Sequence, residues 1–284
     1  MSTLGLIAGD GLLPLLVADG ARAMGDRVVA LAIRGSASRD LAAHVDRLYW
    51  VGPLKIGRMI RRLKRNGATS AVMAGRVRHT NMFLPFRILR FFPDWRGLVF
   101  WYRRLKGDRR ADTLLAAFAD EFAREGIQME SSIARVPDLT VGPGCLTRRA
   151  PSRRDRSDIE LGWRLAKSMG GLDVGQTVVV KEGVVLAMEA AEGTDDCIRR
   201  GAALGHGDVV VVKVAKPNQD LRFDVPTVGP DTISVMGAAG ARVLVIEAGK
   251  TIVLERETLI RAANDAGLTV IALAEGELAG SSVC

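Results

Sequence analysis

The chain has 284 residues, of which 48% are hydrophobic and 25% charged, with a net charge of +8. This balance is typical of a globular protein and excludes a disordered chain, while the length favours two domains over one. The longest apolar runs have the length of a strand, so we expect no membrane-spanning helix. Three scattered cysteines and three scattered histidines argue against a disulfide framework or a zinc site. Because the first residues also lack a signal-peptide pattern, we expect a cytoplasmic protein.

The first half of the chain alternates predicted strands with predicted helices. Hydrophobic periodicity predicts strands over 4–8, 28–33 and 70–73, and helices over 14–24, 53–66 and 111–125. Strands separated by helices pair in parallel through right-handed crossovers. We therefore expect a Rossmann-like parallel sheet in a first domain that spans residues 1–137.

The pattern breaks down between residues 138 and 156, where proline, glycine and arginine accumulate and predict a linker. Ser157 and Glu160 then form a capping-box pattern, which predicts a helix over 158–169. The remaining predicted elements are strands 177–181, 184–189 and 209–214, a helix from Thr194, a loop 215–231 and a strand–helix–strand unit over 243–274. We expect an α/β fold of two domains, in which the smaller C-terminal domain (157–284) is catalytic.

The glycines after the first strand resemble part of a dinucleotide-binding turn. Gly9 and Gly11 would let backbone N–H groups approach a phosphate at the start of the next helix. However, Pro14 replaces the third glycine, and Arg34 follows the second strand where an NAD site needs an acid. A Walker A loop is excluded because no Gly-Lys-Ser/Thr follows. We favour a nucleotide or phosphate site without nicotinamide over a tight turn without ligand, and both over an NAD(P) site.

Most of the excess positive charge lies in one segment, residues 76–110. The segment has ten basic residues against two acids, so its net charge of +8 equals that of the whole chain, and it holds eight of the fourteen aromatic residues. Interleaved rings and arginines suit a membrane interface, where rings enter the acyl boundary and cations contact anionic headgroups. The alternative is a hydrophobic core with a solvated basic rim. Nucleic acid is the least favoured partner, because no recognition motif accompanies the charge.

Two polar stretches in the second half are candidates for phosphoryl chemistry. In residues 189–196, Thr194 fits a helix N-cap with acids in the first turn, so ordinary capping is an alternative to a binding site. Residues 213–229 form a long loop that combines cations, amides and carboxylates, which is uncommon unless the loop binds something. Lysine and arginine can neutralise a pyrophosphate, while carboxylates such as Asp220 and Asp224 can hold a divalent metal or deprotonate water.

Four blocks of the sequence together resemble one enzyme family. They are residues 4–14, 73–77, 173–200 and 213–229, and the most specific reads Val-Val-Lys-Glu-Gly-Val-Val-Leu-Ala-Met-Glu-Ala-Ala-Glu-Gly-Thr-Asp. The chain resembles the UDP-2,3-diacylglucosamine pyrophosphatases of the LpxI type, which act in lipid A biosynthesis. The resemblance implies a magnesium-dependent hydrolase that releases UMP and 2,3-diacylglucosamine 1-phosphate (lipid X), with water directed at the sugar-side phosphorus. The family's essential aspartate, in an Arg-x-Asp-x-Pro-Thr motif, falls on Asp224.

Residue chemistry and resemblance together predict a set of site residues. The predicted catalytic residues are Asp224, Asp220, Lys216 and Arg222, and the predicted Mg²⁺ ligands are Asp224 and Glu189. The predicted substrate-binding residues are Gly9, Asp10, Gly11, Leu13, Pro14, Gly75, Gly193, Thr194, Asp195, Gln219 and Thr227.

The predicted partners are the UDP-linked acylated glucosamine and, through residues 76–110, the cytoplasmic face of the inner membrane. We expect no nucleic-acid partner, and a homo-oligomer is compatible with the sequence. The chain departs from the family at Gly107-Asp108-Arg109, where a second acid is usual. This departure leaves open an alternative, a non-catalytic protein that binds a nucleotide-sugar or an anionic lipid on the same fold.

Overall fold

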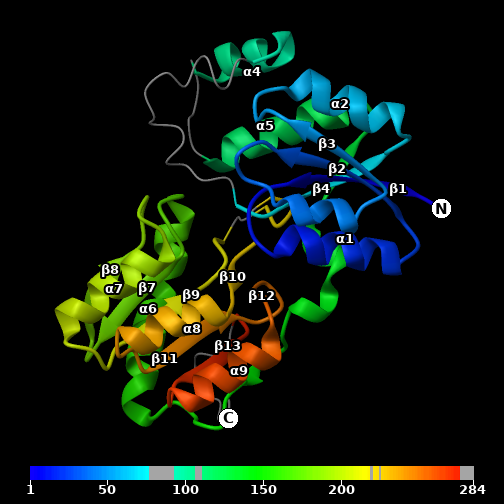
Figure 1. Ribbon diagram of the computed structural model, residues 1–284. Helices are drawn as coiled ribbons and strands as arrows, with labels where there is room; N and C mark the ends of the chain where they lie inside the picture. The colour runs from blue at the N-terminus through cyan, green and yellow to red at the C-terminus, as the bar shows by residue number, and fades with distance from the viewer. Residues whose placement is uncertain (77–92, 106–110, 218–219, 224, 276–284) are drawn as a thin grey trace. The chain divides into compact units, whose positions relative to one another are not determined.

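The structure is a computed structural model that describes residues 1–76, 93–105, 111–217, 220–223 and 225–275 (Figure 1). The chain forms two compact units of similar length. The first comprises Met1–Pro137 together with Asp220–Phe223, and the second comprises Asp138–Gln219 and Asp224–Cys284. Both units are α/β, as expected. Within the described ranges, every helix is too short or too polar to cross a bilayer.

The first unit is built on a parallel sheet of five strands in the order β3-β2-β1-β4-β5. The strands are β1 (Thr3–Ala8), β2 (Arg27–Ile33), β3 (Arg47–Val51), β4 (Ser70–Ala74) and β5 (Gln128–Glu130). The neighbours of β1 in the sheet are β2 on one side and β4 on the other. The strand order therefore reverses next to β1, as in a Rossmann-like sheet.

Helices cover both faces of this sheet. In Figure 1, α1 (Leu13–Ala23) lies on one face, and α2 (Ile56–Arg65) and α5 (Ala111–Ala123) lie on the other. Helix α4 (Trp95–Leu105) packs beside α2. The buried residues of α2 recur with helical spacing and join Phe122 of α5 in one core; they are Ile56, Met59, Ile60 and Leu63. Burying each such side chain stabilises the unit by about 1.5–3 kcal/mol.

The second unit has a mixed sheet of six strands in the order β6-β13-β11-β9-β7-β8. The strands are β6 (Gly144–Cys145), β7 (Thr177–Lys181), β8 (Val184–Met188), β9 (Val210–Lys213), β11 (Val243–Glu247) and β13 (Thr269–Leu273). Strands β9, β11 and β13 are parallel, whereas β7 is antiparallel to both β8 and β9. Two short strands, β10 (Thr227–Val228) and β12 (Ile252–Val253), pair separately.

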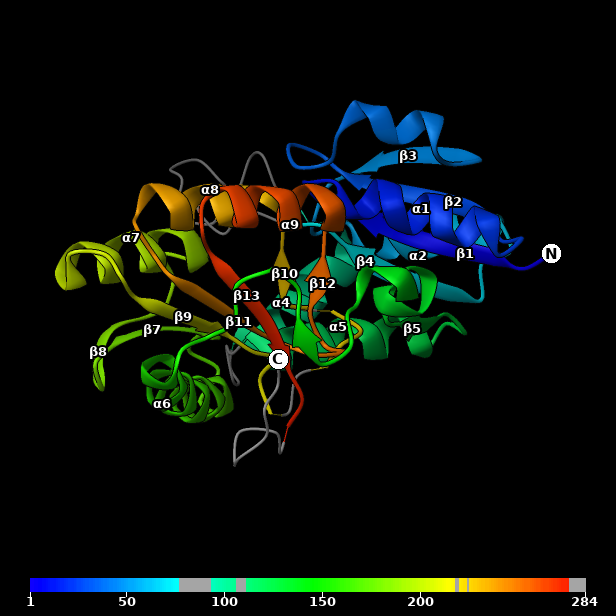
Figure 2. The ribbon, with the colours of Figure 1, turned by 90° about the horizontal axis from the view of Figure 1, so that it is seen from below.

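The helices of the second unit form a layer on each side of its sheet. Figure 2 shows α6 (Arg153–Gly171) on one face, and α7 (Thr194–Gly205), α8 (Pro230–Ala238) and α9 (Arg256–Asp265) on the other. Trp163 of α6 packs against Val212 and its neighbours on one side, and Ile198 and Ile233 pack on the opposite side. The unit therefore has two hydrophobic layers separated by valine-rich strands.

Two details of the second unit differ from the expectation. Helix α6 begins at Arg153, inside the range expected to be a linker, and its capping box is formed by Ser152 and Asp155 rather than by Ser157 and Glu160. Both serines fit the capping-box pattern, but Asp155 is also buried against Arg242, so tertiary packing favours the earlier start. The expected loop 215–231 also contains β10 and the beginning of α8.

Candidate functional site

In the first unit, the turn between β1 and α1 lies at the switch point of the sheet. Ligands of open parallel sheets bind at such points, outside the carboxyl ends of the strands. The turn packs tightly on the segment that follows β4. The N–H of Gly9 donates to the oxygen of Ala74 (2.8 Å), and Asp10 and Arg76 exchange backbone hydrogen bonds of 2.8 and 2.9 Å. A Cβ at Gly9 would lie 2.6 Å from the oxygen of Arg76, and one at Gly75 would lie 2.6 Å from that of Asp10, so both positions require glycine.

The beginning of α1 presents polar backbone to the same turn. Gly11 has a φ of +100°, its Cβ position is open, and its N–H donates to Asp10 Oδ1 at 2.9 Å. No side chain caps α1, and Pro14 in its first turn removes no helical hydrogen bond. Uncapped N–H groups and the helix dipole favour an anion here. The six residues predicted in the first half to bind substrate, including Leu13 and Gly75, thus belong to one pair of packed turns.

In the second unit, polar side chains gather at the edge where β8 and β9 end. Lys213 Nζ donates to Thr194 Oγ1 (3.0 Å) and to the backbone oxygen of Thr227 (3.1 Å). The hydroxyl of Thr194 in turn donates to Glu189 Oε1 (2.9 Å). Three predicted site residues are therefore linked through a lysine that was not predicted. We refer to Glu189, Thr194, Lys213 and Thr227 as the lysine cluster.

The charged members of the lysine cluster are almost fully buried. Lys213 is 7% exposed and Glu189 is 8% exposed. Within the described part of the chain, three buried polar atoms at this edge lack a hydrogen-bond partner, namely Glu189 Oε2, Gln176 Oε1 and Thr177 Oγ1. Leaving such an atom unsatisfied costs about 1–3 kcal/mol. The edge is therefore prepared for a polar ligand that supplies partners to these oxygens.

The structure changes the role expected for Thr194. Gly193, with a φ of +86°, is the N-cap of α7, and Thr194 is its first helical residue. Its hydroxyl donates to Glu189 instead of accepting a hydrogen bond from the helix, so the alternative of ordinary N-capping by Thr194 is wrong. Asp195 lies in the first turn of α7, where the helix dipole favours a carboxylate.

A buried ion pair holds the beginning of the loop that follows β9. Lys167 Nζ lies 2.7 Å from Glu247 Oε2, which also accepts the N–H of Ala215 at 2.8 Å. Next along the chain, Lys216 pairs with Asp173, and both side chains are 10% exposed. The predicted catalytic residue Lys216 is therefore engaged by a carboxylate, which fixes the loop against α6. Its contact with substrate stays a prediction.

Asp220 and Arg222 lie in the segment that belongs to the first unit. The side chain of Arg222 donates to both carboxylate oxygens of Asp220, with Nε at 2.8 and 3.0 Å. This pairing lowers the pKa of Asp220 and raises that of Arg222. The segment is anchored by Phe223, which packs against the core, and by the hydroxyl of Ser131, which donates to the oxygen of Leu221 at 2.8 Å. The two predicted catalytic side chains thus neutralise one another.

Two predicted site residues, Asp224 and Gln219, lie outside the described residues. In the described ranges no three His, Cys, Asp or Glu side chains are close enough to hold a metal ion. The chemistry of the lysine cluster nevertheless fits Mg²⁺, because Glu189 Oε2 is an unpartnered carboxylate oxygen. Mg²⁺ usually binds one or two carboxylates, with waters and substrate phosphates completing its shell.

Sequence reasoning missed the residues that organise the second unit's edge, above all Lys213, Lys167 and Glu247. The available signal was a charged residue that ends a run of buried apolar ones: Lys213 ends Val209–Val212, and Glu247 ends β11. Charged residues are almost never fully buried unless they are paired.

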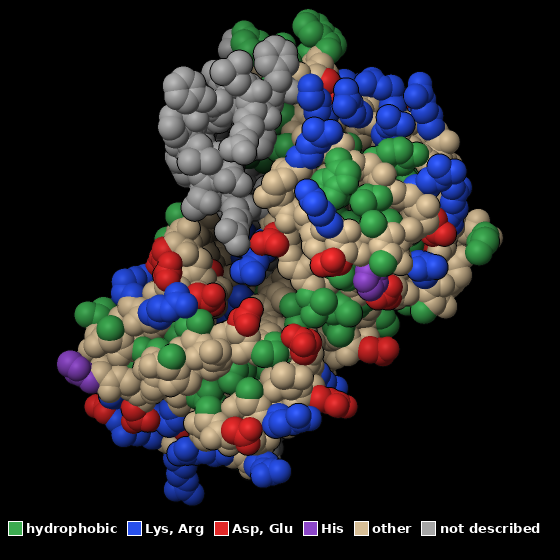
Figure 3. All heavy atoms as spheres, in the orientation of Figure 1, with side chains coloured by type: hydrophobic (Ala, Val, Ile, Leu, Met, Phe, Trp, Pro, Cys, Tyr) green, Lys and Arg blue, Asp and Glu red, His purple; other side chains and the backbone are tan. Residues whose placement is uncertain are grey.

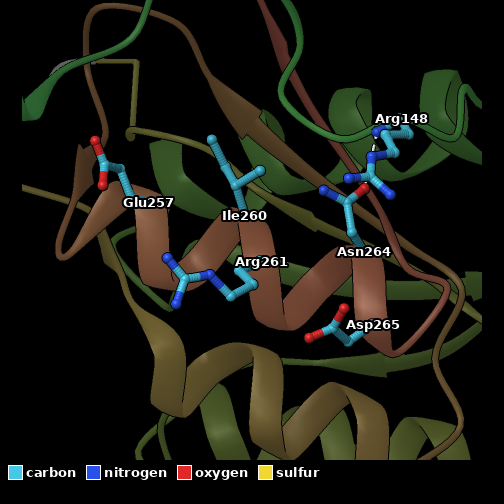
Figure 4. A pocket seen from close by; sticks show the side chains of 6 residues that line it. All are labelled: Arg148, Glu257, Ile260, Arg261, Asn264 and Asp265. Carbon is cyan, nitrogen blue, oxygen red and sulfur yellow. Dashed lines mark hydrogen bonds between the residues drawn. The ribbon is translucent and has the colours of Figure 1, made fainter.

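A buried cysteine and a surface cavity do not fit phosphoryl chemistry. Burial raises the pKa of Cys197 to about 12, so its thiol is not a nucleophile at neutral pH. A cavity of about 310 Å³ lies on the outer face of α9, where the side chain of Asn264 accepts the N–H of Arg148 at 2.9 Å (Figure 4). The other lining side chains are Glu257, Ile260, Arg261 and Asp265. Mixed charges on an exposed face give this cavity no preference for an anionic substrate.

Fold and site define a two-unit α/β protein with an anion-binding type of turn in one unit and a buried lysine–carboxylate cluster in the other. Residues 3–139 match the LpxI N-terminal domain and residues 142–271 match the LpxI C-terminal domain. The chain therefore belongs to the LpxI family.

One relative supports this match over nearly the whole chain. The chain is 35% identical over 280 residues to the UDP-2,3-diacylglucosamine pyrophosphatase LpxI of Caulobacter vibrioides, covering 95% of this chain and 97% of that protein. A solved structure, phosphoribosylglycinamide synthetase from Anaerococcus prevotii, is 10% identical with a TM-score of 0.26. That alignment covers 69% of this chain and 40% of the synthetase, and a TM-score of this size does not indicate a shared fold.

Proposed function

We propose that the protein hydrolyses the pyrophosphate of UDP-2,3-diacylglucosamine to UMP and 2,3-diacylglucosamine 1-phosphate, in lipid A biosynthesis. The observation that carries this proposal is the relative named for this activity, which is 35% identical and aligned over 95% of the chain. In the reaction water adds to one phosphorus, the P–O–P bridge breaks, and each product keeps one phosphate.

The lysine cluster is suited to a phosphoryl group that gains negative charge. The ammonium of Lys213 is held by two oxygens and shielded from water, so it would stabilise charge that develops on a phosphoryl oxygen without first reorganising. Thr194 connects this ammonium to Glu189 and fixes both side chains. Lys213 therefore joins the predicted catalytic residues.

Asp224 and Glu189 would hold Mg²⁺ in this proposal. When bound, the metal polarises a phosphoryl oxygen and lowers the pKa of a coordinated water. The unpartnered oxygen of Glu189 supports its part in this role. The Asp220–Arg222 pair has no net charge. We therefore assign Arg222 an orienting role: once its pairing with Asp220 opens, its N–H groups would donate to a substrate phosphate.

The turn Gly9–Pro14 would bind the nucleotide portion. The start of α1 has no side-chain cap, so its backbone N–H groups can donate to a phosphate, as at other helix N-termini. The close packing of the turn on Gly75 holds these groups in place. The acyl chains of the substrate belong to a bilayer. We therefore include a peripheral position at the cytoplasmic face of the inner membrane in the proposal.

The test is release of UMP from UDP-2,3-diacylglucosamine, measured with Mg²⁺ and with a chelator. We expect Asp224→Ala to reduce turnover by about 1,000-fold, and Glu189→Gln to raise the Mg²⁺ concentration needed for half-maximal rate by about 10-fold. Asp231→Ala, at the exposed start of α8, is the matched control and should retain the wild-type rate. A wild-type protein that binds the substrate but releases no UMP would exclude the hydrolase and leave the non-catalytic binding protein.

A further inference from the structure

The outer face of α2 carries a high density of cations. The helix contains no acid, and its exposed side chains are Arg58, Arg61, Arg62, Lys64 and Arg65. Lys64 pairs with Glu125 at 2.8 Å, and Arg62 stacks over the ring of Tyr49. In the described part of the chain, Arg58, Arg61 and Arg65 form no ion pair. Among the described residues, three arginines on one helical face therefore have no ion-pair partner.

The helix dipole accounts for only part of this arrangement. Cations in the last turn of α2 are favoured by the dipole, but Arg58 lies in the first turn, where a cation is disfavoured. Arg58, Arg61 and Arg65 are also spaced by three and four residues, so their like charges repel. A surface that keeps such charges together is typical of one that meets an external anion.

The neighbouring helix α4 adds an exposed apolar stripe. Trp95, Leu98 and Tyr102 are spaced by three and four residues, and they are 77%, 47% and 61% exposed. The opposite side of α4 faces inward, because a Cβ at Gly97 would lie 2.0 Å from the oxygen of Leu54, just before α2. Large apolar side chains in line on one helix are uncommon on a free surface.

One carboxylate joins the two helices. Asp94 Oδ2 accepts the N–H of Arg58 in α2 at 2.8 Å, and Oδ1 accepts the N–H of Gly97 in α4 at 2.9 Å. The apolar stripe and the basic face are therefore held next to each other. Figure 3 shows Lys and Arg side chains gathered over α2, with hydrophobic side chains of α4 beside them.

We propose that the exposed faces of α2 and α4 form a docking surface for an anionic phospholipid bilayer. The arginines of α2 contact lipid phosphates, each strengthening binding several-fold, while the stripe of α4 enters the boundary between headgroups and acyl chains. Nucleic acid fits less well, because Leu98 offers no ring for base stacking. A second copy of the chain would bring like charges together. The inference extends the membrane part of the proposed function, and its test needs no substrate.

The test is co-sedimentation of the full chain with phosphatidylcholine vesicles, with and without phosphatidylglycerol. We expect binding only with phosphatidylglycerol, and a loss of about 100-fold in affinity for the triple variant R58Q/R61Q/R65Q. The matched control is R153Q/R156Q/R164Q on α6, which removes the same charge from exposed positions of the second unit and should bind within about threefold of wild type.

A second readout addresses the apolar stripe. Brominated lipid should quench tryptophan fluorescence in the wild type and clearly less in Trp95→Phe, which retains an aromatic ring. Equal losses in both triple variants would overturn the proposal, because they would show that net charge alone attracts the vesicles. Binding to single-stranded RNA that exceeds vesicle binding, with no effect of Trp95→Phe, would overturn it in favour of a nucleic-acid surface.

Discussion

Two adjacent strands of the second unit end in the same four residues, Val-Val-Val-Lys, yet the two lysines have different surroundings. The strands are antiparallel, so Lys181 of β7 and Lys213 of β9 lie at opposite edges of the sheet. Lys181 Nζ donates to the backbone oxygens of Gly205 (2.7 Å) and Gly207 (3.0 Å), at the end of α7. Lys213 donates to Thr194, at the beginning of the same helix. The direction of the strand thus decides which end of α7 each lysine contacts.

The helix between the two lysines makes the contrast electrostatic. A cation at the carboxyl end of α7 is stabilised by the helix dipole, which explains Lys181 as a structural cap. A cation at the amino end is opposed by the dipole, so Lys213 needs negative charge nearby. Glu189 supplies one carboxylate, and a substrate phosphate would supply more.

The largest expected difference between the two lysines is in turnover. Lys213→Gln should lower the rate of UMP release by about 100- to 1,000-fold, since it removes a charge positioned for the transition state. Lys181→Gln is the matched control and should retain the rate within about threefold. Similar losses in both variants would mean that both lysines are needed for the fold of the second unit. The proposed difference between a catalytic and a structural lysine would then be wrong.

The hydroxyl that joins Lys213 to Glu189 gives the next largest effect. Thr194→Val keeps the shape of the side chain but removes both hydrogen bonds, and we expect turnover to fall about 10-fold. Thr194→Ser restores the hydroxyl and should recover most of the rate. If the serine and valine variants have the same turnover, the hydroxyl that links Lys213 to Glu189 does not position these two side chains for the reaction.

Stability should show the reverse order of the two sites. Lys181→Met removes two hydrogen bonds at a helix end, and we expect the free energy of unfolding to fall by about 1–2 kcal/mol. The double variant Lys213→Met/Glu189→Met removes both buried charges of the lysine cluster, so it should leave stability unchanged or raise it. Urea denaturation followed by circular dichroism measures both, and a larger loss for the double variant would contradict the assignment of roles.

The smallest effect concerns Glu192, in the turn before α7. A hydrogen bond from its own backbone N–H, followed by one from Arg200, lowers its pKa below the ordinary value of 4.5. A lowered pKa stabilises the folded protein fully above pH 4.5, and this contribution is lost as the pH falls through the folded value. Glu192→Gln should therefore lower the thermal midpoint slightly at pH 7 and not at strongly acidic pH.

The sequence was sufficient to predict strands and helices wherever burial is continuous. The strand predicted over 28–33 and the one over 177–181 lie within a residue of β2 and β7, because every position but the first or last is buried in each. Strand β3 was missed, since it is an edge strand with Trp50 and Arg47 exposed and so lacks an apolar run. Helix α8 was missed because Pro230 begins it directly after a polar loop.

The residues of the candidate site were easier to predict than the hydrogen bonds and ion pairs that join them. Glycines that allow close approach could be recognised from residue type alone, as at Gly9 and Gly75. The role of Lys213 depends on the direction of β7 relative to β9, which no local pattern encodes. Pairing of Lys216 with Asp173 depends likewise on a contact between residues 43 positions apart.

The placement of Phe223 has a consequence for dividing the gene into fragments. This ring comes from the second half of the chain, yet it packs against the core that Phe122 and Ile127 form in the first unit. A recombinant fragment that stops at Pro137 would leave that part of its core uncovered and prone to aggregation. Supplying residues 220–223 as a peptide, or grafting them through a short glycine linker, would restore the missing side chain to the isolated domain.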